Sequence, residues 1–351
     1  MGDDIWREFA AAIESLGEIV ERNASDDIDR AEGYRYLTRL LRGGLEATVE
    51  ATGPTHPVVS TLPNQVKIGA DNPDNLYQTI GVDGRYDYRI TGRRNTVHYL
   101  GFGAYGGGGS AGASSGERAG YLDDHQLDIS PDGTFEIACS QHEQPGNWLR
   151  LLPDTRQIIV RQSYVDRRAE LPAQLNVECT SPPEPYPVLD DLDRLRRQLL
   201  GAVGYAKGTA TTFEGWTHDF MERPNELHQR PKDELATNWS DPNITFYHGY
   251  WTLHPGEALV VSATPPPCDY WNFQLNNWWM ESLDYRFLPV TCNNATARYE
   301  PDGSVRIVIA DRDPGFGTWM DTAGHRHGTM GLRWVRATAE VQPTTELLRT
   351  R

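Results

Sequence analysis

The stretch ITFYHGYWTLHPGEALVVSAT, residues 244–264, decides the fold. It contains two short runs rich in β-branched and aromatic side chains, and four more such runs follow before residue 339. A comparable series begins with RYDYRITG at residues 85–92. Helices do not alternate with these runs, and this argues against a doubly wound parallel sheet. We therefore predict a mainly β protein, with antiparallel jelly-roll or β-sandwich-like sheets; no repeat of fixed period is visible.

Helical patterns lie at the start and in the middle of the chain. Apolar residues recur every three to four positions over 5–20 and 27–49, and again over 188–206. The Pro- and charge-rich stretch 208–243 is expected to be irregular. We predict an N-terminal helical segment (1–55), a first β-rich domain (56–180), a linker of helix and irregular chain (181–243), and a second β-rich domain (244–351).

The charge balance limits the kinds of partner. The 351 residues include 49 acidic and 33 basic side chains, for a net charge of −16, and no basic cluster occurs. Nucleic acid and anionic membranes are therefore poor partners, and no apolar run reaches the ~20 residues needed to cross a bilayer. Only three of the basic residues are lysines. With no leader-like start and no CxxC pair among four cysteines, we expect a cytoplasmic protein.

Two familiar motifs occur in a glycine-rich stretch and are interpreted as chance matches. GFGAYG places Gly101, Gly103 and Gly106 in the GxGxxG spacing of dinucleotide sites, and Gly108, Ser110 and Gly112 match GxSxG. Both motifs require a following helix, whereas the sequence continues with glycine and serine. We expect no organic cofactor, and a mobile surface loop over 103–120 that could cover a site.

Aromatic and amide residues are concentrated near the C-terminus. Seven of the ten tryptophans lie between 239 and 334, where they fill a core, line a pocket, or both. As a strand, YWNFQLNNWW (270–279) places Asn272 and Gln274 on the face opposite Trp271. These amides either face solvent or orient a substrate beside Trp278. Glu281 and Asp284 follow, and could split their pKa values into an acid and a base, or simply favour a helix start.

The segment DPGFGTWMDTAGHRHG, residues 313–328, is the richest in reactive side chains. Asp321 with His325 could serve as an acid/base pair, and His325 with His327 could ligate a metal, or all could be surface residues. His248 and His254 form a second histidine pair. No third metal ligand has a fixed spacing, so we expect no metal site. Lys67, Asn72, Asn75 and Tyr77 form an upstream polar cluster that either closes a turn or faces a ligand.

Four blocks of the chain resemble the bacterial family called domain of unknown function 1214. They are DNPDNLYQTIGVDGRYDYRITG, GNWLRLLPDTRQIIVRQSYVD, YWNFQLNNWWMESLDYR and DPGFGTWMDTAGHRHGTMGLRW; the first is also similar to domain of unknown function 1254. The resemblance implies a jelly-roll-like fold, and an association with bacteria that modify steroids, terpenoids and aromatic compounds. It implies no reaction. The terminal family pattern falls on Trp319, Asp321, His325, Gly328, Arg333 and Trp334.

These patterns together predict a small-molecule enzyme, a lyase or hydrolase, that uses carboxylate/His acid–base chemistry on a largely apolar, oxygen-bearing metabolite. We expect Asp321, His325 and Glu281 to be catalytic. The substrate-binding residues are expected to be Tyr77, Asn272, Gln274, Trp278, Trp319 and Arg333. Two alternatives stay open: a non-catalytic ligand- or carbohydrate-binding protein, and a His/carboxylate metalloenzyme. Association into a homo-oligomer is also open.

Overall fold

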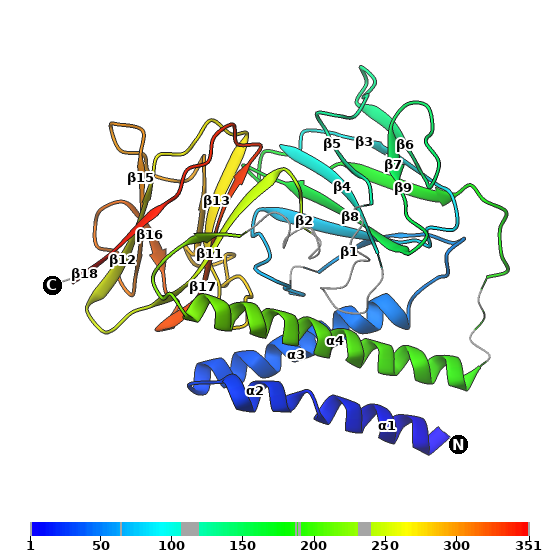
Figure 1. The fold of residues 1–351 in the computed structure, drawn as a ribbon, viewed down its shortest axis with the longest axis horizontal. Coiled ribbons are helices and arrows are strands. Elements are labelled where there is room, and N and C mark those ends of the chain that lie inside the picture. Colours follow the sequence, from blue (N-terminus) through cyan, green and yellow to red (C-terminus); the bar gives the residue numbers. More distant parts are fainter. Residues whose placement is uncertain are drawn as a thin grey trace.

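Two β-sandwiches lie side by side on a layer of helices (Figure 1). The computed structural model describes residues 2–63, 65–106, 119–186, 188, 191–230 and 240–349, and contains four helices and eighteen strands within them. Every strand pair is antiparallel except β6–β7 and β15–β16, which are parallel. The prediction of a mainly β, sandwich-like fold with N-terminal and linking helices is confirmed.

The first sandwich comprises strands β1–β9. One sheet has the order β1-β2-β8-β4-β5 and the other β7-β6-β3-β9. Apolar residues from both sheets, such as Phe102 and Ile137, meet in one buried cluster. The strands are β1 (Val59–Thr61), β2 (Asn75–Gly81), β3 (Tyr88–Arg93), β4 (Tyr99–Gly106), β5 (Tyr121–Asp123), β6 (Thr134–Ser140), β7 (Trp148–Arg150), β8 (Thr155–Ser163) and β9 (Gln174–Cys179).

The second sandwich repeats this topology strand for strand. Its sheets have the orders β10-β11-β17-β13-β14 and β16-β15-β12-β18, which are the first-sandwich orders with nine added to each strand number. The chain therefore contains two copies of one strand topology, and this repeat was not predicted from the sequence. The strands are β10 (His228–Gln229), β11 (Ile244–Thr252), β12 (Glu257–Ala263), β13 (Tyr270–Leu275), β14 (Thr291–Asn293), β15 (Val305–Ala310), β16 (Thr318–Asp321), β17 (His327–Val335) and β18 (Thr344–Arg349).

The helical layer consists of α1 (Gly2–Glu14), α2 (Gly17–Asn23), α3 (Asp27–Thr48) and α4 (Leu192–Met221). Asp26 caps α3 by accepting the backbone N–H of Asp29, at 2.8 Å. Helices α3 and α4 cross so closely that a β-carbon on Gly44 would lie 2.5 Å from the carbonyl oxygen of Ala202. None of the described helices is long and apolar enough to cross a membrane.

Helix α4 is longer than the sequence pattern indicated. The expected irregular stretch begins at residue 208, but the helix continues to Met221. Glycine and threonine are weak helix formers, which is why the pattern fades there. Phe213 and Phe220 are nonetheless buried in the helical core, the apolar cluster that α1–α4 form with residues such as Trp278 and Trp279. Packing against the second sandwich therefore outweighs the intrinsic helix propensity of this segment.

Candidate functional site

A small, highly charged pocket lies where the helical layer meets the second sandwich. Its volume is about 150 Å³. Four segments line it: α3, the chain around Lys67, the loop after β13 and the loop between β16 and β17. Six lining side chains carry a formal charge in addition to His325: Glu32, Arg35, Arg39, Lys67, Asp284 and Arg286.

Helix α3 supplies three of these charged side chains from one face. Glu32, Arg35 and Arg39 are spaced i, i+3 and i+7, so they align along the helix. Arg35 pairs with Glu32 at 2.7 Å, across one helical turn. Arg39 reaches away from the helix and pairs with Glu281 of the second sandwich at 2.6 Å.

His325 and Glu32 form an ion pair between the β16–β17 loop and α3. His325 Nε2 lies 2.9 Å from Glu32 Oε2, and its Nδ1 lies 3.0 Å from the Thr322 carbonyl oxygen. Both ring nitrogens thus face acceptors, an arrangement that suits the imidazolium. Burial alone would lower the pKa of His325, but the hydrogen bond and charge of Glu32 raise it overall. Burial likewise opposes ionisation of Glu32, yet His325 brings the pKa of Glu32 below its ordinary value.

A second carboxylate, Glu281, lies behind this pair and is 1% exposed. Asn277 links the two acids, because its Nδ2 donates to Glu32 at 2.9 Å and to Glu281 at 3.0 Å. Burial raises the pKa of Glu281 by more than Arg39 and Asn277 lower it. Two linked carboxyl groups therefore have pKa values displaced in opposite directions, which is the arrangement expected of an acid and a base.

The remaining predicted catalytic residue, Asp321, does not line the pocket. Its carboxylate accepts the backbone N–H of Ala323 at 2.8 Å and so closes a turn. His325 pairs with Glu32 in place of the predicted Asp321. Asp284 also differs from the expected acid/base partner of Glu281, because it is half-exposed and pairs with Arg286 at 2.8 Å.

The predicted amide row joins the two halves of the chain. Asn272 donates to Asn72 at 3.0 Å, and Gln274 donates to the Asp71 carbonyl at 2.8 Å. Arg333 donates to Gln274 at 2.6 Å and to the Ala70 carbonyl. Asn272 and Gln274 are completely buried and bonded within the protein, so they tie β13 to the segment before β2 and do not line the pocket.

The predicted aromatic ligands have packing roles. Trp251, Trp271 and Trp334 fill the interior of the second sandwich, and Trp278 belongs to the helical core. Trp319 packs on the outer sheet and donates to the Ala310 carbonyl at 3.0 Å. The hydroxyl of Tyr77 accepts the backbone N–H of Asn72 at 3.1 Å, which closes the turn before β2. None of these six side chains lines the pocket.

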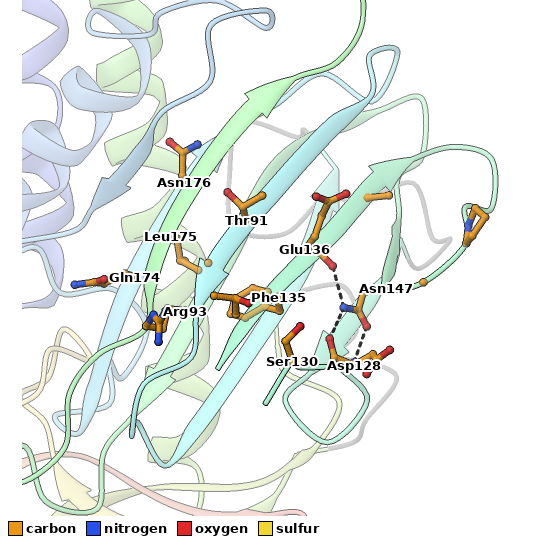
Figure 2. A pocket seen from close by; sticks show the side chains of 15 residues that line it. Thr91, Arg93, Asp128, Ser130, Phe135, Glu136, Asn147, Gln174, Leu175 and Asn176 are labelled. Atoms are coloured by element: carbon orange, nitrogen blue, oxygen red, sulfur yellow. Dashed lines mark hydrogen bonds between the residues drawn. The ribbon is translucent and has the colours of Figure 1, made fainter. Parts of the chain in front are cut away.

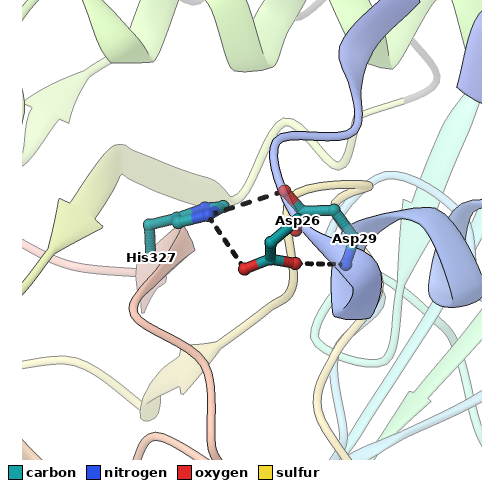
Figure 3. Close-up of side chains that lie close together, drawn as sticks. All are labelled: Asp26, Asp29 and His327. Carbon is teal, nitrogen blue, oxygen red and sulfur yellow. Dashed lines mark hydrogen bonds and ion pairs between the residues drawn. The ribbon is translucent and has the colours of Figure 1, made fainter. Parts of the chain in front are cut away.

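The two histidines of the His-Arg-His motif approach α3 at separate places. His327 Nε2 lies 3.5 Å from Asp29 and 4.0 Å from Asp26, and these side chains converge at the start of α3 (Figure 3). Within the part of the chain that the structure describes, this is the group of His and acidic residues that could hold a metal ion. His325 is not part of it. The other predicted histidine pair is also divided, because His248 is buried and His254 is exposed.

A wider groove of about 770 Å³ lies on the outer sheet of the first sandwich (Figure 2). Asn147 lies at one side of it, and its amide donates to the main-chain carbonyls of Asp128 and Glu136. Arg93 and Phe135 also line it. No residue predicted for the site is in this groove.

The glycines of the GxGxxG motif lie in β4, a strand and not a phosphate-binding turn. A β-carbon on Gly101 would collide with the Tyr121 hydroxyl, and one on Gly103 with the Tyr105 hydroxyl. These glycines make room for tyrosines. The GxSxG match at Gly108, Ser110 and Gly112, and most of the predicted mobile loop, lie outside the described residues.

Sequence reasoning missed Glu32, Arg35, Arg39 and Asn277. The three helix residues look like the solvated face of an amphipathic helix, which is the usual role of such a pattern. Their i, i+3, i+7 alignment is a signal, but their partner Glu281 is 242 residues away from Arg39. Asn277 was seen only as part of the amide-rich run.

The fold and the pocket define a protein of two matched β-sandwiches on a helical layer, with a charged pocket at the junction. A solved structure of a putative uncharacterized protein from Burkholderia cenocepacia is 41% identical in sequence, covers 98% of this chain and 96% of that chain, and superimposes with a TM-score of 0.92. The chain belongs to the same family as that protein.

A second solved structure shares the fold alone. The VPA0106 protein from Vibrio parahaemolyticus is 10% identical, covers 97% of this chain and 99% of that chain, and has a TM-score of 0.52. No protein-family profile and no curated protein matches the chain.

Proposed function

We propose that this protein is a small-molecule enzyme that uses the His325–Glu32 pair for proton transfer in an elimination, hydration or hydrolysis. The observation that carries the proposal is the ion pair itself, which lies in a small charged pocket with a second carboxyl group of raised pKa behind it. In the ion pair, His325 is the acid and Glu32 is the base. Asn277 and Arg39 are positioning residues that hold the two carboxylates.

The pocket favours a different substrate from the one predicted. Sites for drug-sized ligands occupy ~300–1,000 Å³, whereas this pocket has about 150 Å³. A steroid or terpenoid is larger than this pocket. The tryptophans expected to bind an apolar ring system lie elsewhere, Trp278 in the helical core and Trp319 on the outer sheet of the second sandwich. We therefore propose a small, polar, oxygen-bearing substrate.

Two conservative variants test the proposal. His325→Gln and Glu32→Gln remove a proton-transfer group while keeping polar side chains, and each should lower kcat by ~10²–10⁴-fold on a substrate found by screening small hydroxy and keto compounds. His254→Gln, at an exposed histidine outside the pocket, is the matched control. Unchanged turnover in both pocket variants, with unchanged thermal unfolding, would rule out the assigned roles.

A binding protein without catalysis is the second candidate, and the groove of the first sandwich favours it. At about 770 Å³ the groove is large enough for a sugar or a comparable metabolite, and amides such as Asn147 and Asn176 line it. Isothermal titration with a glycan panel tests this candidate. Binding that is lost in Asn176→Ala but kept in His325→Gln would place the ligand in the groove.

A metal-dependent reaction is the third candidate, supported by the cluster of Asp26, Asp29 and His327. Elemental analysis of the purified protein tests it. One bound metal ion per chain in the wild type, lost in His327→Gln, is the outcome expected of a metalloenzyme. The assignment to domain of unknown function 1214 and the cytoplasmic location stay predictions from the sequence.

A further inference from the structure

Lys67 is a buried cation to which the proposed proton transfer assigns no role. Its side chain lines the pocket although the residue is only 7% exposed. The ammonium donates to the Ser282 carbonyl and, at 3.3 Å, to the Leu283 carbonyl, and it lies 5.2 Å from the centre of the Tyr285 ring. An ammonium has three N–H donors, so these two carbonyls leave one free.

The other cations of the pocket each have a carboxylate partner. Arg35 pairs with Glu32, Arg39 with Glu281, and Arg286 with Asp284. Among the described residues, no carboxylate forms an ion pair with Lys67, whose direct partners are neutral carbonyls and an aromatic ring.

The nearby acids act on Lys67 only from a distance. Asp71 accepts hydrogen bonds from the backbone N–H and the hydroxyl of Ser282. Glu281 forms its ion pair with Arg39, and Asp284 forms its ion pair with Arg286. Burial lowers the pKa of Lys67 by more than these acids raise it. A buried charge without a direct counter-charge is costly, and an anion in the pocket would offset that cost.

The volume of the pocket limits the size of that anion. A water molecule occupies ~30 Å³ in the liquid, so about 150 Å³ holds roughly five waters. A molecule of about five to seven non-hydrogen atoms fills the same space, which corresponds to an organic acid of three or four carbons.

We propose that the substrate of this pocket is a small carboxylate, bound through its carboxyl group to Lys67. The assignment deepens the proposed function and rests on it for the chemistry. The carboxylate takes the free N–H donor of the ammonium and supplies the missing counter-charge. The rest of the molecule then lies in the same pocket as His325 and Glu32.

The first experiment compares matched probes on the wild-type protein. Thermal unfolding is followed with lactate, pyruvate, inorganic phosphate and lactamide, which has the size of lactate but no charge. We expect lactate or pyruvate to raise the Tm in a concentration-dependent way, and lactamide to have no effect. Equal effects of lactate and lactamide, no effect of either carboxylate, or a larger effect of phosphate would each overturn the assignment.

The second experiment tests whether Lys67 supplies the positive charge that binds the carboxylate. Lys67→Met should weaken binding of the stabilising carboxylate roughly 10-fold or more, because a charge-assisted hydrogen bond is lost. Lys207→Met is the matched control, since Lys207 is an exposed lysine on α4. Full affinity in Lys67→Met would overturn the proposal. If that variant does not fold, the comparison of lactate with lactamide on the wild type still decides.

The two proposals fail in different ways. His325→Gln should retain carboxylate binding while it loses turnover. A carboxylate that binds through Lys67 but is turned over equally by wild type and His325→Gln would contradict the proton-transfer role alone. Turnover of neutral substrates that depends on His325, and is unchanged in Lys67→Met, would contradict the carboxylate assignment alone.

Discussion

The two sandwiches have the same strand order but different relations to the helices. The helical core includes Tyr250, Trp278, Trp279 and Met280 of the second sandwich, whereas its one fully buried member between α3 and α4, among the described residues, is Ala70 in the segment before β2. The loop between β16 and β17 carries His325 to α3. Its counterpart between β7 and β8 is the short turn at 151–154, which has no histidine.

This difference shows where the chemistry of a duplicated fold can arise. Both copies provide a stable sheet framework, but they contribute differently to the helical contact. The second places Tyr250 of β11, the loop after β13 and the loop before β17 against the helices, whereas the first contributes the segment before β2 that contains Ala70. The candidate site therefore depends on contacts between the copies and the helical layer. Substitutions at those contacts should be costly, and comparable substitutions in the first sandwich should be mild.

The largest effect on stability is expected at the ion pair that joins α3 to the second sandwich. Glu281→Ala leaves Arg39 without its partner and should lower the free energy of unfolding by about 3–5 kcal/mol. Arg89→Ala removes exposed ion pairs on the first sandwich, to Glu136 and Glu178, and should cost about 1 kcal/mol or less. Urea unfolding followed by tryptophan fluorescence measures both. Equal losses would mean that the two regions do not differ as described.

A smaller effect is expected where α3 touches Trp279. A β-carbon on Gly33 would lie 2.5 Å and 2.8 Å from two Trp279 ring atoms, so Gly33→Ala should destabilise the protein by about 1–3 kcal/mol. Gly215→Ala on α4 meets no atom within 4 Å and should stabilise by about 0.5–1 kcal/mol through helix propensity. Differential scanning calorimetry should therefore show Tm changes of opposite sign. A neutral Gly33→Ala would show that α3 can move away from the sandwich.

The smallest expected effect on stability is a pH dependence of the contribution that the His325–Glu32 ion pair makes to the free energy of unfolding. The pKa of His325 is raised, so its stabilising contribution is complete below the ordinary value of about 6.5 and is lost as the pH rises through the raised pKa. The pKa of Glu32 is lowered, so its contribution is complete above the ordinary value of about 4.3 and is lost as the pH falls through the lowered pKa.

The stability difference between wild type and His325→Gln should accordingly be greatest between about pH 4.5 and 6.5. It should decline on either side of that interval. Urea unfolding at a series of pH values measures it, with His254→Gln as the control. A difference that stays constant across the range would show that the contact does not couple to protonation.

Much of the architecture could be predicted because strand periodicity is local. The alternation that places Trp271 and Phe273 in the core and Asn272 and Gln274 opposite them is visible in six residues. The duplication was not visible, because the copies share strand order while most side chains differ. Only scattered matches are present, such as PDG at 131–133 and 301–303, and Arg161 and Arg333 at equivalent places in β8 and β17.

The candidate site was predictable only in part. His325 and Glu281 could be predicted as site residues because titratable side chains are rare within an aromatic and glycine-rich region. Their partners are on α3, whose charged face has the pattern of any solvated helix. Contacts over 242 to 293 residues leave no local pattern, so the pairing of Glu32 with His325 could not be read from either segment.

The distance along the chain between α3 and its partners has a consequence for synthesis. Trp279 donates its indole N–H to the Asp29 carbonyl across 250 residues. At ~5–20 residues per second, the N-terminal helices leave the ribosome ~12–50 seconds before that tryptophan is made. During this interval the apolar stripe of α1–α3 has no sandwich to cover it, whereas the first sandwich can already close its own core. We expect nascent chains that stop before β11 to require chaperones for their first fifty residues.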